Sequence, residues 1–173
     1  MASNITRIAA VYYLGSTGKV FMEETLSDDV TSIDAIIQAL YDSISGAADQ
    51  KRDVRRFRSL FIPEARLIRT APTPEGGATA NVFDVDEYFK TACEYFKVSG
   101  FFEREIARRV DSFGNIAHVL STYESRHNAD DPVPFSRGVN SIQLFKDGAR
   151  WQVVTIFWDF ERPDNPIPPE YLP

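Results

Sequence analysis

The sequence has 173 residues, of which 43% are hydrophobic and 25% charged, so it predicts one folded domain and excludes a wholly disordered chain. Its 25 acidic residues outnumber the 19 basic ones, and the formal charge of -6 argues against nucleic acid or an anionic membrane as a partner. The single cysteine, Cys93, excludes an internal disulfide and a cysteine-rich zinc site. The 13 Phe, 7 Tyr and 2 Trp suit a deep core or a lined cavity.

A short apolar run, residues 8–14, follows Arg7 near the start of the sequence. It is much shorter than the roughly 20 residues that a membrane-spanning helix needs, and no small-residue cleavage site follows it. We therefore expect a cytoplasmic protein in which residues 1–27 form an N-terminal extension.

Residues 28–44 are predicted to form an amphipathic helix. Ser27, Asp28 and Asp29 offer side-chain oxygens to its first amides, and Gly46 can end it. Apolar side chains recur there with the spacing of one helical stripe: Ile33, Ile36, Ile37, Leu40, Tyr41 and Ile44.

Two further helices and two strands are predicted before Gly100. The second helix begins at Asp53 and ends at Pro63, because proline disfavours helical geometry in the residue before it. The third helix is capped by Asp84 or Asp86 and ends at Gly100. The strands are residues 65–70 and 81–85. We interpret a run of basic residues around the second helix as a charged outer face: Lys51, Arg52, Arg55, Arg56 and Arg58.

Everything after Gly100 is rich in residues that favour β-sheet. Gly114-Asn115 and Lys146-Asp147-Gly148 supply hairpin turns between the strands. Residues 163–173 hold five prolines and are predicted to be an extended, polyproline-like tail on the surface or on a partner. The predicted strands are residues 101–111, 115–127, 138–145 and 150–160.

This order of elements predicts an α+β fold for residues 28–162. A long antiparallel sheet must bend, and three N-terminal helices packed against its concave face complete a cone. Such a cone leaves a cavity between the helices and the sheet, where a small ligand can bind.

The chain resembles the nuclear transport factor 2-like superfamily, also called ketosteroid isomerase-like or SnoaL-like, over roughly residues 29–161. The resemblance rests on three features: a first helix that ends in Ser45-Gly46, the pattern Arg56-Phe57-x-x-Leu60-Phe61-x-x-x-Ala65 before a strand, and Lys146-Asp147-Gly148-x-x-Trp151 at the last strand. It implies a cystatin-like cone and a homodimer formed through the outer sheet face. It also implies a pocket that in different members isomerises, dehydrates, cyclises or only binds.

The steroid isomerase residues of that superfamily do not carry over. The position of its general-base aspartate falls near Arg69, a permanent cation that cannot accept a proton. Its helix-borne tyrosine falls near Leu40, next to Tyr41, and its second acid falls near Ser141. The dehydratase branch uses pocket histidines with an aspartate, which leaves His118 as the residue that could support this chemistry.

His118 lies in the second long strand, on one face with Leu120, Thr122, Glu124 and Arg126. A two-residue turn at Gly114-Asn115 places Asp111 opposite His118, so the carboxylate could orient and charge the imidazole. The alternative is a solvent-exposed ion pair at a hairpin end.

Charged side chains further along that strand allow two interpretations. In the same register Glu103 and Glu105 lie near Glu124 and Arg126. These four side chains could hold a polar ligand group at the cavity mouth, or form a salt network at the surface or a dimer interface. On the last strand we place Trp158 toward the cavity and Phe157 toward a dimer partner, by analogy with the superfamily.

The sequence therefore predicts a homodimer that binds a small, mostly apolar molecule. In a first hypothesis it is a cofactor-independent lyase or isomerase, with His118 as base or acid, Asp111 orienting it, and Tyr41 or Arg69 polarising an oxygen. In a second it is a non-catalytic ligand- or protein-binding module. A sealed position of His118 favours the first and an exposed one the second. The predicted pocket residues are Leu40, Tyr41, Phe61, Arg69, Phe89, Leu120, Thr122, Ile156 and Trp158, with no metal site.

Overall fold

The computed structural model describes residues 11–14, 20–23 and 27–173. Strands β1 (Val11–Leu14) and β2 (Val20–Glu23) pair antiparallel with each other in a two-stranded sheet. Apart from these two strands and Ser27, the predicted N-terminal extension lies outside the described residues.

The predicted first helix is divided into two parts. A 3-10 turn, η1 (Asp28–Val30), precedes α1 (Ile33–Ile44), because Ser32 caps α1 by accepting a hydrogen bond from the Ala35 amide at 3.0 Å. Ser27 caps η1 in the same way. The other helices are α2 (Val54–Ser59) and α3 (Val85–Val98), and Asp84 begins α3 with a capping box.

The predicted end of the second helix at Pro63 is wrong. Helix α2 ends at Ser59, and strand β3 (Phe61–Pro72) continues through Pro63. The pairing of β3 with β8 shifts register between Phe61 and Arg66, and proline is tolerated at such an irregularity because it has no amide to donate to the ladder.

A six-stranded sheet has the strand order β4-β3-β8-β7-β6-β5. The predicted α+β, cystatin-like cone is confirmed, but the sheet is mixed and not wholly antiparallel, since β3 and β8 pair in parallel. The second long hairpin turns at Gly148 and Ala149, where Gly148 has φ 57°, so Lys146 and Asp147 belong to the strand. The remaining strands are β4 (Ala78–Phe83), β5 (Phe102–Phe113), β6 (Ile116–Arg126), β7 (Ser136–Asp147) and β8 (Arg150–Phe160).

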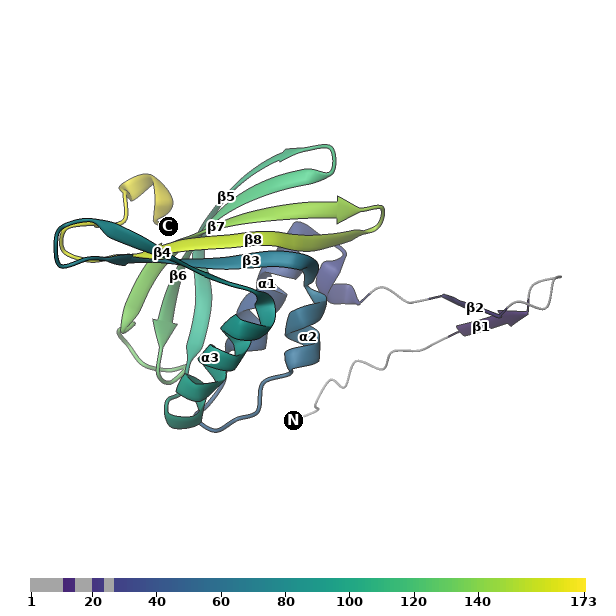
Figure 1. Cartoon of the computed structure of the whole chain (residues 1–173), viewed down its shortest axis with the longest axis horizontal. Coiled ribbons are helices and arrows are strands. Elements are labelled where there is room, and N and C mark those ends of the chain that lie inside the picture. The colour runs from purple at the N-terminus through teal and green to yellow at the C-terminus, as the bar shows by residue number, and fades with distance from the viewer. Residues whose placement is uncertain (1–10, 15–19, 24–26) are drawn as a thin grey trace.

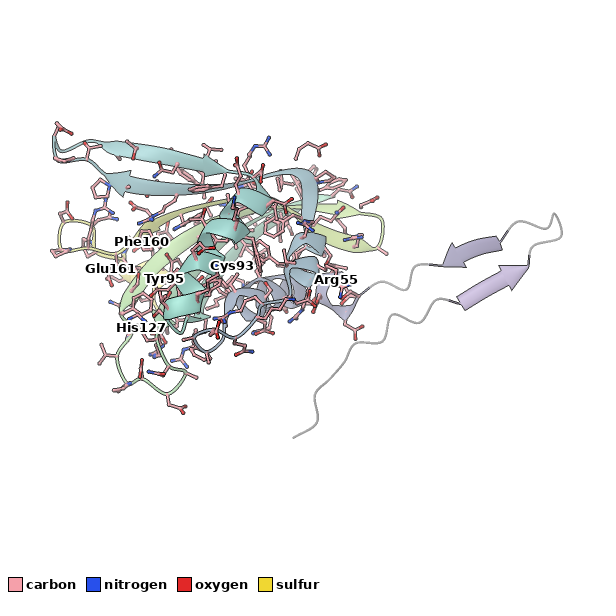
Figure 2. All side chains as sticks on the ribbon, turned by 60° about the horizontal axis from the view of Figure 1, so that its bottom comes forward. Arg55, Cys93, Tyr95, His127, Phe160 and Glu161 are labelled. Atoms are coloured by element: carbon pink, nitrogen blue, oxygen red, sulfur yellow. The ribbon has the colours of Figure 1, made fainter. Side chains whose placement is uncertain are left out.

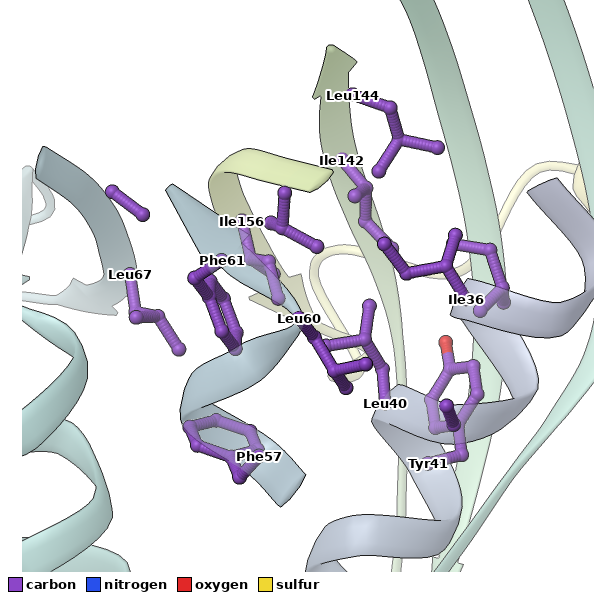
Figure 3. Close-up of a cluster of buried hydrophobic side chains, with 14 of the residues drawn as sticks. Ile36, Leu40, Tyr41, Phe57, Leu60, Phe61, Leu67, Ile142, Leu144 and Ile156 are labelled. Atoms are coloured by element: carbon purple, nitrogen blue, oxygen red, sulfur yellow. The ribbon is translucent and has the colours of Figure 1, made fainter. Parts of the chain in front are cut away.

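The three α-helices lie on one side of the curved sheet, which we call the inner face (Figure 1). The core is formed where α1 and α2 meet β3, β7 and β8. Figure 3 shows its main apolar side chains, which are Ile36, Leu40, Phe57, Leu60, Phe61, Leu67, Ile142, Leu144 and Ile156. Burial of these apolar side chains stabilises the packing of the helices on the sheet.

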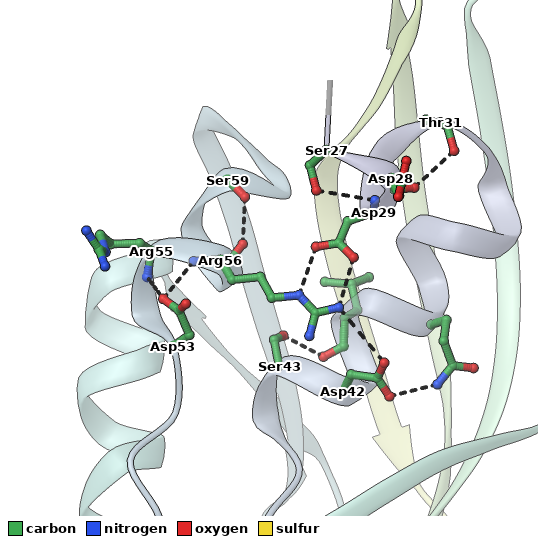
Figure 4. Close-up of polar contacts among 12 residues, drawn as sticks. Ser27, Asp28, Asp29, Thr31, Asp42, Ser43, Asp53, Arg55, Arg56 and Ser59 are labelled. Atoms are coloured by element: carbon green, nitrogen blue, oxygen red, sulfur yellow. Dashed lines mark hydrogen bonds and ion pairs between the residues drawn. The ribbon is translucent and has the colours of Figure 1, made fainter. Parts of the chain in front are cut away.

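Arginines tie α2 to its neighbours. The Arg56 guanidinium donates two hydrogen bonds to Asp29, at 2.8 and 2.9 Å, and lies 3.9 Å from an Asp42 oxygen (Figure 4). Arg52 is buried, and its guanidinium donates to backbone carbonyls at the end of α1 and just after it, including those of Ile44 and Gly46. The basic run is therefore only partly the charged outer face that we predicted.

The proline-rich tail folds back onto the sheet face opposite the helices, the outer face. It contains a second 3-10 turn, η2 (Pro169–Tyr171), so the predicted extended form does not hold over these residues. The Thr122 hydroxyl on β6 donates to the Tyr171 carbonyl at 2.6 Å, and Arg109 lies over the Tyr171 ring. Within the described residues the tail thus covers part of its own sheet.

Candidate functional site

A cavity of about 420 Å³ lies between the inner sheet face and the helices. This volume falls within the range of about 300–1,000 Å³ that is typical of small-molecule sites. Most of the wall is aromatic or aliphatic. Its polar side chains come from six elements and are Tyr41 on α1, Arg69 on β3, Tyr88, Thr91 and Tyr95 on α3, Glu103 on β5, Tyr123 and Ser125 on β6, and Ser136 and Asn140 on β7.

The structure places five predicted pocket residues on this wall: Leu40, Tyr41, Arg69, Ile156 and Trp158. Phe61 and Phe89 do not line the cavity, because they pack against Phe57 in the adjoining core, with ring centroids 4.9 and 5.1 Å from it. Leu120 and Thr122 lie on the outer face of β6, so their assignment to the pocket was wrong.

The predicted pairing of Asp111 with His118 is found, but both residues lie outside the cavity. The alternate residues of β6, among them Val119 and Tyr123, face the helices and are buried, which leaves His118 on the outer face. His118 Nε2 lies 2.9 Å from the Ser141 hydroxyl, and the exposed Asp111 makes no ion pair within residues 27–173. The structure therefore does not support their assignment as the catalytic pair.

Glu103 is the acidic side chain on the cavity wall. The sequence predicted it on the same face as Glu124 and Arg126, and the structure places it on the opposite face. The register of β5 with β6 shifts between Glu105 and Ala107, so Glu103 pairs with Ser125 and shares its inner face. This bulge reverses the alternation of the strand before it. The Ser125 hydroxyl donates a 2.8 Å hydrogen bond to Glu103.

The chemistry of Glu103 follows from its surroundings. Burial raises the pKa of this carboxyl from 4.5 to about 7, and the Ser125 hydrogen bond offsets only part of that rise. The part of its surface that remains accessible faces the cavity. Near neutral pH the group therefore exchanges readily between acid and base forms, as a general acid/base must.

Tyr41 takes part in a hydrogen-bond chain beside Glu103. The Asn140 amide donates to the Tyr41 hydroxyl at 3.1 Å, and the Tyr41 hydroxyl lies 2.7 Å from Ser121. Because Ser121 donates its own proton to Glu105 at 2.5 Å, it must accept from Tyr41. Burial is the main cause that raises the pKa of Tyr41, and the hydrogen bonds with Ser121 and Asn140 offset only part of that rise, so the phenol keeps its proton.

Tyr88 and Tyr123 place two more phenols on the wall. Burial is the main cause that raises the pKa of each, and the negative charge of Glu103 adds to it. Neither phenol shows a hydrogen bond among residues 27–173 that would lower its pKa. These hydroxyls therefore remain free to donate to the oxygen of a bound molecule.

Arg69 lies where the cavity meets solvent. Its guanidinium stacks over the Phe160 ring, 5.2 Å from the centroid. Figure 2 shows Phe160 and Tyr95 on the same side of the molecule, beside α3. Both residues belong to the cavity wall.

Glu124 and Arg126 do not hold a ligand group at the cavity mouth, as one of our interpretations had it. Glu124 lies on the outer face, where it accepts hydrogen bonds from Arg104 at 2.6 Å and from Arg126. The salt network that we offered as the alternative is present among these three residues.

The part of the chain that the structure describes contains no group of three or more His, Cys, Asp or Glu side chains placed to hold a metal ion. No helix among those residues has the length and apolar character to cross a membrane.

The structure has a cystatin-like fold, which it shares with solved proteins described as cystatin-like or NTF2-like. A protein of unknown function with this fold from Nostoc punctiforme matches with a TM-score of 0.56 and 12% identity, over 76% of this chain and 90% of that one. An NTF2-like protein of unknown function from Silicibacter pomeroyi matches with a TM-score of 0.50 and 14% identity, over 75% of this chain and 92% of that one.

A protein of unknown function from Mycobacterium tuberculosis matches with a TM-score of 0.57 and 12% identity, over 75% of this chain and 70% of that one. No protein-family model and no curated protein matches the sequence. At these identities the likeness establishes the fold, and the function must be argued from the cavity itself.

Proposed function

We propose that this protein binds a small, mostly apolar molecule in the cavity and acts on it as a cofactor-independent lyase or isomerase, with Glu103 as general acid/base. The observation that carries the proposal is an ionisable carboxyl on an apolar wall whose pKa burial raises to about 7. Perturbed carboxyls of this kind are typical of proton-transfer sites.

A complete isomerisation can be written with the residues present. The Glu103 carboxylate removes a proton from a carbon that lies between a carbonyl group and a C=C bond. The electron pair of that C–H bond forms a new C=C bond to the carbonyl carbon, and the π pair of the carbonyl group moves to its oxygen, which gives a dienolate. Tyr88 or Tyr123 donates a hydrogen bond to the developing negative charge. Glu103 then returns the proton to the far carbon of the dienolate, which restores the carbonyl group and the carboxylate and leaves the C=C bond conjugated with the carbonyl.

Deuterium exchange tests this chemistry. Aryl ketones incubated with the protein in D2O lose C–H signals from the carbon next to the carbonyl, and proton NMR follows the rate. We expect Glu103→Gln to slow the protein-dependent exchange by at least about 100-fold. Glu94→Gln, on the exposed side of α3, is the matched control and should leave the rate unchanged. Equal rates for wild type and Glu103→Gln contradict the proposal.

A non-catalytic, ligand-binding homodimer is the second candidate. It is favoured by the position of His118 outside the cavity and by apolar side chains on the outer sheet face. Phe113, Ile116 and Phe145 form a cross-strand row at one end of that face, and all three are exposed. Exposed apolar rows of this kind suit a self-complementary dimer contact.

Sedimentation velocity tests the dimer. We expect the wild-type protein to sediment as a dimer and Ile116→Glu to sediment as a monomer. Val98→Glu places the same charge on an exposed position of α3, on the helical side, and should leave the dimer intact. A monomeric wild-type protein contradicts this part of the proposal.

A further inference from the structure

Arg69 differs from most other arginines of the described chain in what its guanidinium contacts. Carboxylates or backbone carbonyls accept from Arg52, Arg56, Arg58, Arg104, Arg108, Arg126, Arg137 and Arg162. Among residues 27–173, Arg69 has no ion pair, and its recorded contact is the Phe160 ring. Stacking on a ring leaves the N–H donors at the edge of the guanidinium plane unused.

The cavity wall carries two ionisable groups of opposite sign at different ends. Arg69 belongs to β3 and Glu103 to β5, and β8, β7 and β6 lie between these strands. Four strand steps of about 4.8 Å separate them by roughly 19 Å across the strands of the sheet. The wall between them is mostly apolar, with Leu67, Ile142 and Ile156 among its residues.

We propose that the ligand is an amphipathic organic anion, whose carboxylate or similar headgroup binds Arg69 while its apolar body fills the cavity. A guanidinium can donate two parallel hydrogen bonds to the two oxygens of such a group. Stacking on the Phe160 ring restricts the orientation of the Arg69 guanidinium. This inference rests on the proposed function, because the same molecule occupies the same cavity.

The arrangement also gives the bound molecule a direction. An anionic headgroup is attracted to Arg69 and repelled by ionised Glu103, so the uncharged end of the molecule points toward Glu103. The reacting carbon is then distant from the headgroup, by a spacing that the curved sheet sets. The chain itself carries a formal charge of -6, so nonspecific attraction of anions cannot produce the binding.

Two fluorescent probes with the same rings test the inference. 1-Anilinonaphthalene-8-sulfonate is an anion, and N-phenyl-1-naphthylamine is the same molecule without the sulfonate. Fluorescence titration measures the dissociation constant of each probe. We expect the anionic probe to bind the wild-type protein at least about tenfold more tightly. Arg69→Gln should remove that preference and leave binding of the neutral probe unchanged.

Two further variants serve as controls. Arg66→Gln removes a charge from the outer face of the same strand and should preserve the preference. Ala92→Phe fills the cavity from α3 and should abolish binding of both probes. An equal loss of both probes in Arg69→Gln would show a structural role and overturn the inference.

The outcomes separate this inference from the proposed function. Equal affinity of the wild-type protein for both probes overturns the anionic ligand, while cavity binding stands if Ala92→Phe abolishes it. Undiminished binding to Ala92→Phe, or no binding of either probe to the wild type, overturns the ligand cavity and the inference together.

Discussion

Glu103 on β5 and Glu124 on β6 lie at neighbouring positions of the β5–β6 pair but on opposite faces of the sheet, and they show how the two faces differ. Glu103 pairs with Ser125 on the inner face, and its neighbour Arg104 pairs with Glu124 on the outer face. Burial without a cationic partner raises the pKa of Glu103 to about 7. Burial also opposes ionisation of Glu124, yet hydrogen bonds from Arg126 and Arg104 lower the pKa of that carboxyl.

Cationic partners therefore reverse the effect that burial has on the pKa of a carboxyl in this sheet. Both groups are withdrawn from bulk water, but only Glu124 has cations within hydrogen-bond distance. The outer face therefore holds a permanently charged structural network. The inner face holds a carboxyl that can gain or lose a proton near pH 7.

The largest effect is expected on the outer face. Glu124→Gln leaves the buried Arg126 guanidinium without its counter-charge and should lower the free energy of unfolding by about 4 kcal/mol. Denaturant unfolding at pH 7 measures it. Arg104→Gln removes a cation whose side chain is 68% exposed, so it should cost no more than about 1 kcal/mol. Equal losses in the two variants would contradict a buried pair.

Replacing glutamate by glutamine on the inner face should instead raise the free energy of unfolding. Glu103→Gln removes a carboxyl whose ionisation opposes folding, so the variant should be more stable above pH 7, by up to about 3 kcal/mol. The folded wild type holds its proton between pH 4.5 and about 7 while the unfolded chain loses it, so wild-type stability falls across that window as pH rises. Below pH 4.5 the free energies of unfolding of the variant and the wild type should become equal.

Unfolding curves measured from pH 4 to pH 8 check this difference. A constant gap between Glu103→Gln and wild type at all pH values would mean that Glu103 has an ordinary pKa. The comparison of the two faces would then fail.

A smaller effect is expected from the chain that holds Tyr41. Tyr41→Phe leaves the Asn140 amide without its acceptor and should lower the free energy of unfolding by about 1–2 kcal/mol. Tyr95→Phe, at a 40% exposed position, is the control and should change it by less than about 0.5 kcal/mol. If Tyr41→Phe left the free energy of unfolding unchanged, the stability of the inner face would not depend on this hydrogen-bond chain.

The smallest effect is expected where the tail meets the outer face. Thr122→Val removes the hydrogen bond to the Tyr171 carbonyl and should lower the free energy of unfolding by about 1 kcal/mol or less, since that carbonyl can turn to water. Thermal unfolding resolves a change of this size. Thr79→Val, whose hydroxyl makes a long 3.4 Å contact at an exposed position, should be neutral. A loss well above 1 kcal/mol would show that the tail supports the whole domain.

Much of the fold could be predicted from local patterns. The apolar stripe of the first helix, the strand composition after Gly100 and the turn at Gly114 each correspond to observed elements. The pairing of Asp111 with His118 followed from that turn alone. The boundaries near Ser32 and Pro63 were missed, because a cap and a strand irregularity override the wider pattern.

The candidate site was less predictable, because side-chain alternation shows two faces without showing which one meets the helices. Residues 118, 120 and 122 were assigned to the cavity when the other face of β6 lines it. A mostly small or apolar set, with Val119, Ser121 and Tyr123, was the available signal for the inner face.

Local patterns along the chain were enough to predict a curved sheet covered by helices, because periodicity, turn residues and aromatic content act over short stretches of sequence. The entry of Glu103 into the cavity depends instead on how β5 and β6 pair. A one-residue bulge between Glu105 and Ala107 turned Glu103 to the inner face, and no local pattern specifies where a strand pair slips by one residue.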